Sequence, residues 1–434
     1  MDMTLAVGIG SVVAILVCVY SGMQVAIALA LVSGVALWVF SGSPDLSMHL
    51  AVASATDGIS SYSFGVVPLF ILMGAFVGEA DLGRDAFRVA NTMIGRFRGG
   101  LGVATVIANA IFAAITGISI ASAAIFSRVA VPEMMRFGYT PRFATGVVAG
   151  SSILGMLMPP SVLLIVYAIV AQQSVAAMFR AAIAPALILT VLYSVGILLM
   201  ARLRPGMVQP NPQTADIERL GPLAFIGAAS PLAILVLMVL GGIYAGIFTP
   251  TEAGAAGAMI AFVILVAKRR FSASRFWQVI LDSARMTASI LFLIICATMY
   301  SRMLGVTGMP FRLAGWISEA NVSFGMLMII YCVLMILLGM ILDSTSTMLI
   351  LIPIFLPAVQ AFGGDPVWLG VLTVIGAEIG LLTPPLGISV FVVKGAVNDP
   401  KISLGDVFRG AFPFAVMMTI LLVVLVLFPG ITLL

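Results

Sequence analysis

The chain has 434 residues, of which 62% are hydrophobic and only 9% are charged, and its formal net charge is +4. A soluble globular protein has about 25% charged residues, so this composition excludes a large soluble domain and indicates a membrane protein. The small positive excess is typical of lysine and arginine in cytoplasmic loops and gives no reason to expect a nucleic-acid partner.

Apolar stretches about as long as a membrane span recur from end to end of the chain. At about 20 residues per helical span, the length allows about ten to thirteen full or partial crossings. The first stretch has no basic segment before it and another stretch directly after it, so we expect a retained helix rather than a signal peptide. The sequence therefore predicts an all-α polytopic membrane protein. Examples of these stretches are residues 5–20, 23–40, 223–240 and 412–428.

The basic residues divide the chain into two halves of opposite orientation. The motif GMLMPP at 155–160 recurs as GLLTPP at 380–385, an offset of 225 residues. Segments 84–98 and 128–142 hold seven arginines, whereas the segments 225 residues later hold only Arg312. Because basic loops face the cytoplasm, this distribution predicts the inverted repeat of many secondary transporters. The expected units are a first half at 1–204, a cytoplasmic linker at 205–222 and a second half at 223–434.

The spacing of the basic segments predicts a re-entrant helical hairpin in each half. Only 29 residues, 99–127, separate the two arginine-rich segments, whereas two full spans need about 40 residues. This segment is therefore expected to enter and leave the membrane on one side, with its tip near 116–119. The equivalent segment, 324–352, is expected to enter from the other side, with its tip near 339–345.

Each hairpin is followed by a helix that a proline pair interrupts, because two adjacent prolines remove two backbone donors. The expected broken helices are 143–168 and 368–393. Non-helical backbone at membrane depth must be buried in protein or line a cavity. Free carbonyls at such breaks bind small cations, and the N-termini of half-helices favour anionic groups. The sequence thus predicts an ion-coupled carrier for an anion, with both tips and both breaks near the middle of the membrane.

Five longer motifs follow one another in a specific order over nearly the whole chain. They are VPLFILMGAFV at 67–77, RFRGGLG at 96–102, MLMPPS at 156–161, GIFTPTEAG at 246–254 and GLLTPPLG at 380–387. In this order they resemble the large membrane subunit of the tripartite ATP-independent periplasmic (TRAP) transporters. The resemblance implies an elevator-type fold and sodium-coupled import of an organic acid that a periplasmic substrate-binding protein delivers.

The resemblance also implies a location and partners. A protein of this family lies in the bacterial inner membrane among lipids, needs no organic cofactor, and works with a small four-helix membrane subunit. Because the chain opens directly on large-subunit sequence, we expect that subunit to be a separate polypeptide.

Two sodium sites follow from the same resemblance. This chain has Thr116 and Ile118 where serines are usual in the first tip, so Ile118 offers no side-chain ligand. The first site is expected to use oxygens of Thr116, Ser119, Gly155, Met158 and Pro159. The second is expected to use Gly339, Gly380, Thr383 and Leu386. The candidates for lining the substrate are Gly117, Ser161, Asp343, Glu378, Pro384 and Pro385, and no catalytic residue is predicted.

Several of these residues also have a structural explanation. Glycines at the tips allow close helix packing, and Asp343 or Glu378 would equally serve to cap a helix or pair with an arginine. The segment TPTE at 249–252 is typical of a capping box that starts a helix. Arg180 and Arg302 are expected to extend to the membrane interface rather than to contact substrate.

Three other functions compete with the carrier. An intramembrane enzyme is disfavoured because the single histidine, His49, lies far from both proline motifs and because no HExxH, Walker or GxGxxG pattern is present. A membrane scaffold would not require two broken helices in an inverted repeat. A stand-alone sodium-coupled dicarboxylate carrier shares the same logic and is the main alternative.

Overall fold

The computed structural model describes residues 3–95, 97–208, 220–319 and 322–432. In these ranges the regular secondary structure is helical, apart from one isolated bridge between Tyr139 and Val208. Six of the described helices are long and apolar enough to cross a membrane, or eight if each of two bent pairs counts as one span. The predicted all-α polytopic architecture is confirmed.

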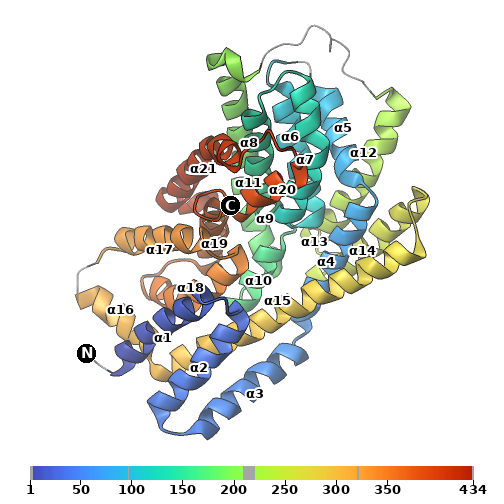
Figure 1. Ribbon diagram of the computed structural model, residues 1–434. Coiled ribbons are helices and arrows are strands. Elements are labelled where there is room, and N and C mark those ends of the chain that lie inside the picture. Colours follow the sequence, from blue (N-terminus) through green and yellow to red (C-terminus); the bar gives the residue numbers. More distant parts are fainter. Residues whose placement is uncertain (1–2, 96, 209–219, 320–321, 433–434) are drawn as a thin grey trace.

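Helices from the start of the chain lie along the longest helix, α15 (Ala273–Thr307), which contacts α2, α3 and α4 (Figure 1). Helices α4 and α5 form a pair bent by 66°. The bend lies at Ala80 and Asp81, and Asp81 has a left-handed backbone with φ 57°. The bounds are α1 Met3–Tyr20, α2 Val25–Ser41, α3 Pro44–Ser60, α4 Val66–Glu79 and α5 Leu82–Ile94.

Helix α5 occupies much of segment 84–98, where the number of basic residues predicts a loop. Its Leu82, Ala86 and Phe87 are buried, whereas Arg84 is exposed. Arg84 and Arg88 therefore lie on the outer side of an amphipathic helix. Because its apolar residues are buried and its basic residues are exposed, this segment forms a helix rather than a loop.

The first hairpin consists of α6 (Gly100–Thr116) and α7 (Ser119–Arg136), which pack against each other. Its turn is at Gly117 and Ile118, within the predicted tip. Helix α7 continues past residue 127 to Arg136, so the first part of the charged segment 128–142 is helical and not a loop. The interrupted helix comes next, as α8 Pro141–Ser152, α9 Leu154–Leu157 and α10 Val162–Val170, with a bend of 41°.

The middle of the chain connects the two hairpins. Thr249 and Glu252 form a capping box at the start of α14, as the sequence predicts: the Thr249 amide donates to the Glu252 carboxylate at 2.8 Å, and the Glu252 amide donates to the Thr249 hydroxyl at 3.3 Å. Most of the predicted linker 205–222 lies outside the described residues. The helices are α11 Val175–Leu203, α12 Pro222–Val236, a π-helical turn Leu237–Gly241, α13 Gly242–Tyr244, α14 Pro250–Ala267 and α16 Met309–Glu319.

The second hairpin and its interrupted helix repeat the order of the first. Helix α7 of the first half packs on α20, α8 packs on α21, and α9 packs on α19, so the two halves interlock around the broken helices (Figure 1). The bounds are α17 Phe324–Gly339, α18 Ser344–Ala361, α19 Pro366–Gly380, α20 Ile388–Val397 and α21 Leu404–Leu427.

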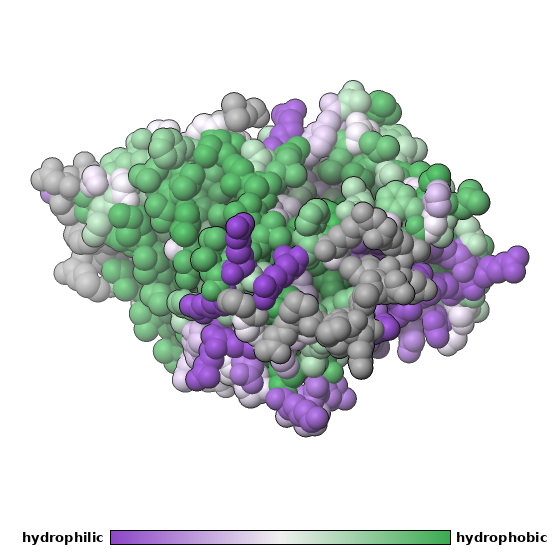
Figure 2. Space-filling model, turned by 90° about the horizontal axis from the view of Figure 1, so that it is seen from above, coloured by the Kyte–Doolittle hydropathy of each residue, from purple (hydrophilic) through white to green (hydrophobic). Residues whose placement is uncertain are grey.

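The outer surface is that of a membrane protein. Seen from above, hydrophobic residues cover most of the molecule, and hydrophilic residues gather in patches (Figure 2). Large apolar side chains such as Val17, Trp38 and Leu237 are more than half exposed, which suits contact with lipid rather than water.

Candidate functional site

The first hairpin tip is held against the first proline pair. The Val162 amide, just after Pro160, donates to the Gly117 carbonyl at 3.2 Å. Gly117 has φ 64°, and a Cβ atom there would lie 2.5 Å from the Pro160 carbonyl oxygen, so both the backbone conformation and the close approach require glycine. A Cβ atom at Gly155 would lie 2.7 Å from the Ser119 Cα atom. The predicted residues Gly117, Ser119 and Gly155 are therefore neighbours.

The second tip is held in the same way. The Leu386 amide, just after Pro385, donates to the Met340 carbonyl at 3.3 Å. A Cβ atom at Gly380 would lie 2.3 Å from the Gly339 carbonyl carbon. The Thr383 hydroxyl donates to the Ile379 carbonyl at 2.6 Å. Gly339, Gly380 and Leu386 therefore meet at one junction between α17, α19 and the second break.

The backbone of the first break offers free oxygens. Met158 and Pro159 are buried between α9 and α10, and their carbonyls accept no hydrogen bond from the part of the chain that the structure describes. Thr116, by contrast, donates its hydroxyl to the Phe112 carbonyl at 2.9 Å within α6. Buried carbonyls without a donor are the groups that a small cation satisfies.

Two of the predicted substrate-lining residues cap helices. Asp343 accepts hydrogen bonds from the Thr345 and Ser346 amides, both at 3.1 Å, at the start of α18. The Ser161 hydroxyl accepts from the Leu164 amide at 3.3 Å at the start of α10, and it donates to the Met156 carbonyl. These contacts fix the N-termini of two half-helices beside the breaks, so each side chain has a structural role in addition to any contact with substrate.

Glu378 lies where the two halves join. The residue is fully buried on α19, two positions before Gly380. The Ser344 hydroxyl donates to its Oε1 atom at 2.7 Å, and the Ser119 hydroxyl lies beside the same carboxyl. Sequence reasoning missed Ser344, although the offset of 225 residues that relates the proline pairs also relates Ser119 to Ser344.

The arginines considered for substrate binding have other positions. Arg302 pairs with Asp57 and donates to the Ser54 hydroxyl at 3.4 Å, which joins α15 to α3. Arg180 is exposed on α11. Arg302 is thus engaged within the group of helices along α15, away from the two breaks.

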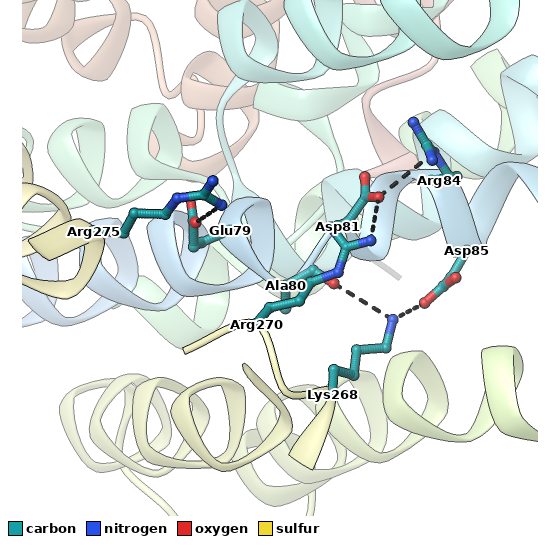
Figure 3. Close-up of polar contacts among 8 residues, drawn as sticks. All are labelled: Glu79, Ala80, Asp81, Arg84, Asp85, Lys268, Arg270 and Arg275. Carbon is teal, nitrogen blue, oxygen red and sulfur yellow. Dashed lines mark hydrogen bonds and ion pairs between the residues drawn. The ribbon is translucent and has the colours of Figure 1, made fainter. Parts of the chain in front are cut away.

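Ion pairs join the bend between α4 and α5 to the turn between α14 and α15 (Figure 3). We call this set the elbow cluster. Each exposed pair contributes about 0–1 kcal/mol, but together they attach the bend to the end of the longest helix. The pairs are Lys268 with Asp85, Arg270 with Asp81 (3.0 Å), Arg84 with Asp81 (3.5 Å) and Arg275 with Glu79 (3.1 Å).

Two hairpins whose tips meet two broken helices, inside a bundle of apolar helices, are the features of a multi-pass secondary transporter. The fold is similar to that of the YdaH transporter of Alcanivorax borkumensis, with a TM-score of 0.63, 15% sequence identity and coverage of 86% of this chain and 88% of that one.

The sequence comparisons define the family. The family model for the tripartite ATP-independent periplasmic transporter, DctM component, matches residues 12–431. The chain is 33% identical to the C4-dicarboxylate TRAP transporter large permease protein DctM of Pseudomonas aeruginosa, over 92% of this chain and 91% of the relative. It is 28% identical to the sialic acid TRAP transporter large permease protein SiaM of Vibrio cholerae, over 98% and 97%.

The chain therefore belongs to the DctM component family of TRAP transporters, as its motifs suggest. It is a multi-pass protein of the inner membrane and a large permease subunit of a TRAP transporter. Large permeases of this family work with a substrate-binding protein and a small permease.

Proposed function

We propose that the chain couples the import of a carboxylate to sodium ions by an elevator mechanism, with the substrate delivered by a periplasmic binding protein and the small permease as a separate chain. The observation that carries this proposal is the repeated contact between tip and break: the Gly117 carbonyl with the Val162 amide, and the Met340 carbonyl with the Leu386 amide. Each contact brings irregular backbone from two elements together, which is how secondary transporters build ion and substrate sites.

Cation binding would use main-chain oxygens in both halves. The first site would be formed by Thr116, Ser119, Gly155, Met158 and Pro159, and the free carbonyls of Met158 and Pro159 support it. The second site would be formed by Gly339, Gly380, Thr383 and Leu386, which lie close together. The chemistry needed from these groups is to replace the hydration shell of a monovalent cation, which uncharged carbonyl and hydroxyl oxygens do well.

The substrate class rests on the relatives and on the helix ends. The relatives' names include C4-dicarboxylate and sialic acid, both of which carry carboxylates. The half-helices α10 and α18 begin beside the breaks, and helix N-termini favour anionic groups. The elevator element of the proposal is supported by the bent pair α4–α5 and by α15, which form an arm beside the interlocked halves.

Reconstitution tests the proposal. The chain, its small permease and its binding protein would be placed in proteoliposomes, and uptake of a labelled carboxylate that the binding protein holds would be measured with and without an inward sodium gradient. We expect uptake only with the gradient and only with the binding protein. Uptake that is the same in potassium as in sodium would refute the coupling, and uptake without the binding protein would favour the stand-alone carrier.

A further inference from the structure

A carboxylate and two hydroxyls from three helices meet at the junction of the two halves. Glu378 comes from α19, Ser344 is the first residue of α18, and Ser119 is the first residue of α7. The exposed fractions of the three residues are 0%, 4% and 0%. Ser344 binds one carboxylate oxygen at 2.7 Å, whereas Ser119 lies beside the carboxyl but outside normal hydrogen-bond geometry.

Two of the oxygens at this junction lack a partner. Glu378 Oε2 and Ser119 Oγ form no hydrogen bond within the described residues. Glu378 also forms no ion pair with any described lysine or arginine. A fully buried carboxylate without a counter-charge is strongly unfavourable, so this group needs a positive ligand or a proton.

The surroundings favour a monovalent cation. Among the described residues no group of three or more His, Cys, Asp or Glu side chains gathers in one place. The neighbouring Asp343 carboxylate is engaged by the Thr345 and Ser346 amides, so the carboxylate at this junction with an unpartnered oxygen is that of Glu378. The α7 N-terminus has no side-chain cap, and its partial positive charge favours a negative group beside it. A single negative charge with hydroxyl and carbonyl oxygens matches a singly charged hard cation.

We propose that Glu378 is the charged ligand of the first sodium site, and that Ser344 positions its carboxylate from the opposite hairpin. This inference rests on the proposed sodium coupling, because Ser119 is shared with the first site and lies against Gly155. The repeat places serines at both equivalent positions, but the position equivalent to Glu378 in the first half is Ile153. One carboxylate thus serves both hairpins, and cation binding at the first tip is linked to the second tip through Ser344.

Thermal unfolding of the purified full chain with its small permease tests the inference. Melting temperature would be measured against sodium concentration, with choline keeping ionic strength constant, for the wild type, E378Q, S119A and S344A. The matched control is T373V, a buried position on the same helix that bonds Tyr331 and the Leu369 carbonyl instead. Because a ligand that binds only the folded state stabilises it, each titration gives an apparent sodium affinity.

We expect E378Q to weaken sodium binding by at least about tenfold, since hydrogen bonds and contacts to charged groups are the strong ones. S119A and S344A should weaken it by about threefold, and T373V should leave it unchanged. In sodium-free buffer E378Q should melt above the wild type, because it removes an uncompensated buried charge. E378Q should thus melt above the wild type without sodium and gain less from added sodium. A glutamate with a purely structural role would not make the difference between the two melting temperatures depend on sodium.

The outcomes separate this inference from the proposed function. Sodium stabilisation of E378Q that equals the wild type would overturn the role of Glu378 and leave sodium coupling intact. A wild type that responds to neither sodium in the melt nor a sodium gradient in uptake would overturn both. Stabilisation of the wild type by acid alone would make Glu378 a proton carrier and overturn the cation site. Should E378Q fail to fold, an unchanged sodium affinity in S344A contradicts the inference, because Ser344 belongs to neither proposed sodium site.

Discussion

The two breaks share a backbone design and differ in their exposure. In each half an amide just after the proline pair binds a carbonyl of the hairpin tip, and both Pro-Pro bonds are cis. Residues 158–161 of the first break are buried, whereas Pro384, Pro385 and Leu386 of the second are exposed, Leu386 by 44%. Exposed irregular backbone is not tolerated in lipid, so the second break requires water or a protein partner over it.

The two halves therefore share the hydrogen bond between tip and break but differ in how the surrounding helices cover that break. The first break is enclosed by α6, α7, α10 and α11, which all contact α9. The second runs over 381–387, between Gly380 and Ile388, and is the longer of the two. A carrier with one closed and one open break has the asymmetry that alternating access requires.

Cysteine labelling would test the comparison most directly. In a variant without Cys18, Cys296 and Cys332, we expect L386C to react with a water-soluble maleimide and L157C, fully buried beside the first break, to remain unlabelled. The reaction would be followed by gel shift in membrane vesicles, before and after denaturation. Equal labelling of both positions would show that the two breaks are equally open.

Replacing Gly380 by alanine would break the second junction. The new Cβ atom would lie 2.3 Å from the Gly339 backbone, so the tip must move away from the break, and a misplacement of about 1 Å in a functional site costs on the order of 100-fold in rate. Carboxylate uptake in proteoliposomes is the measurement. The control is G227A in α12, where a Cβ atom has open space; if G227A loses as much uptake as G380A, the tip contact is not the cause.

Truncation of leucine in each break should separate their roles in stability. L157A leaves a cavity at a fully buried position and should lower the free energy of unfolding by about 2–5 kcal/mol. L386A at the exposed break should cost less than about 1 kcal/mol. Denaturant unfolding in detergent measures both, and similar losses would contradict the difference in burial.

A smaller loss than that of L157A should come from removing a single amide. Val162 is the first residue of α10, a position that accepts proline, and the preceding Ser161 has the extended backbone that proline needs, with ψ 131°. V162P leaves the buried Gly117 carbonyl without its donor, which should cost about 1–3 kcal/mol. V162A is the control, since it also shortens the side chain but keeps the amide; equal losses would argue against the hydrogen bond.

Much of the site was predictable from local sequence. The proline pairs, glycines and loop spacing locate both tips, because breaks in a helix have local chemical causes. The contact of Glu378 with Ser119 and Ser344 was not predicted, since it joins segments that are far apart in the chain and the two serines look ordinary by themselves. The 225-residue offset, applied to every polar residue, would have singled out that serine pair.

The open second break and the helix at 82–94 were also not predicted. Exposure of Leu386 depends on which elements of the other half pack nearby, and no pattern within 380–387 carries that information. The number of arginines in 84–98 predicts a basic loop, whereas their spacing among apolar residues is typical of the amphipathic helix α5. In both cases the outcome depends on which side of the segment packs against the rest of the protein.

The buried carboxylate of Glu378 also has an electrical consequence for the proposed carrier. Glu378 and a bound monovalent cation together are neutral, so loss of the cation gives the returning domain one additional negative charge. A membrane potential that is negative inside would push that empty form outward, by up to about 2.3 kcal/mol per 100 mV for a full crossing of the field. The voltage across the membrane would thus assist the return stroke, and the sodium gradient would drive loading.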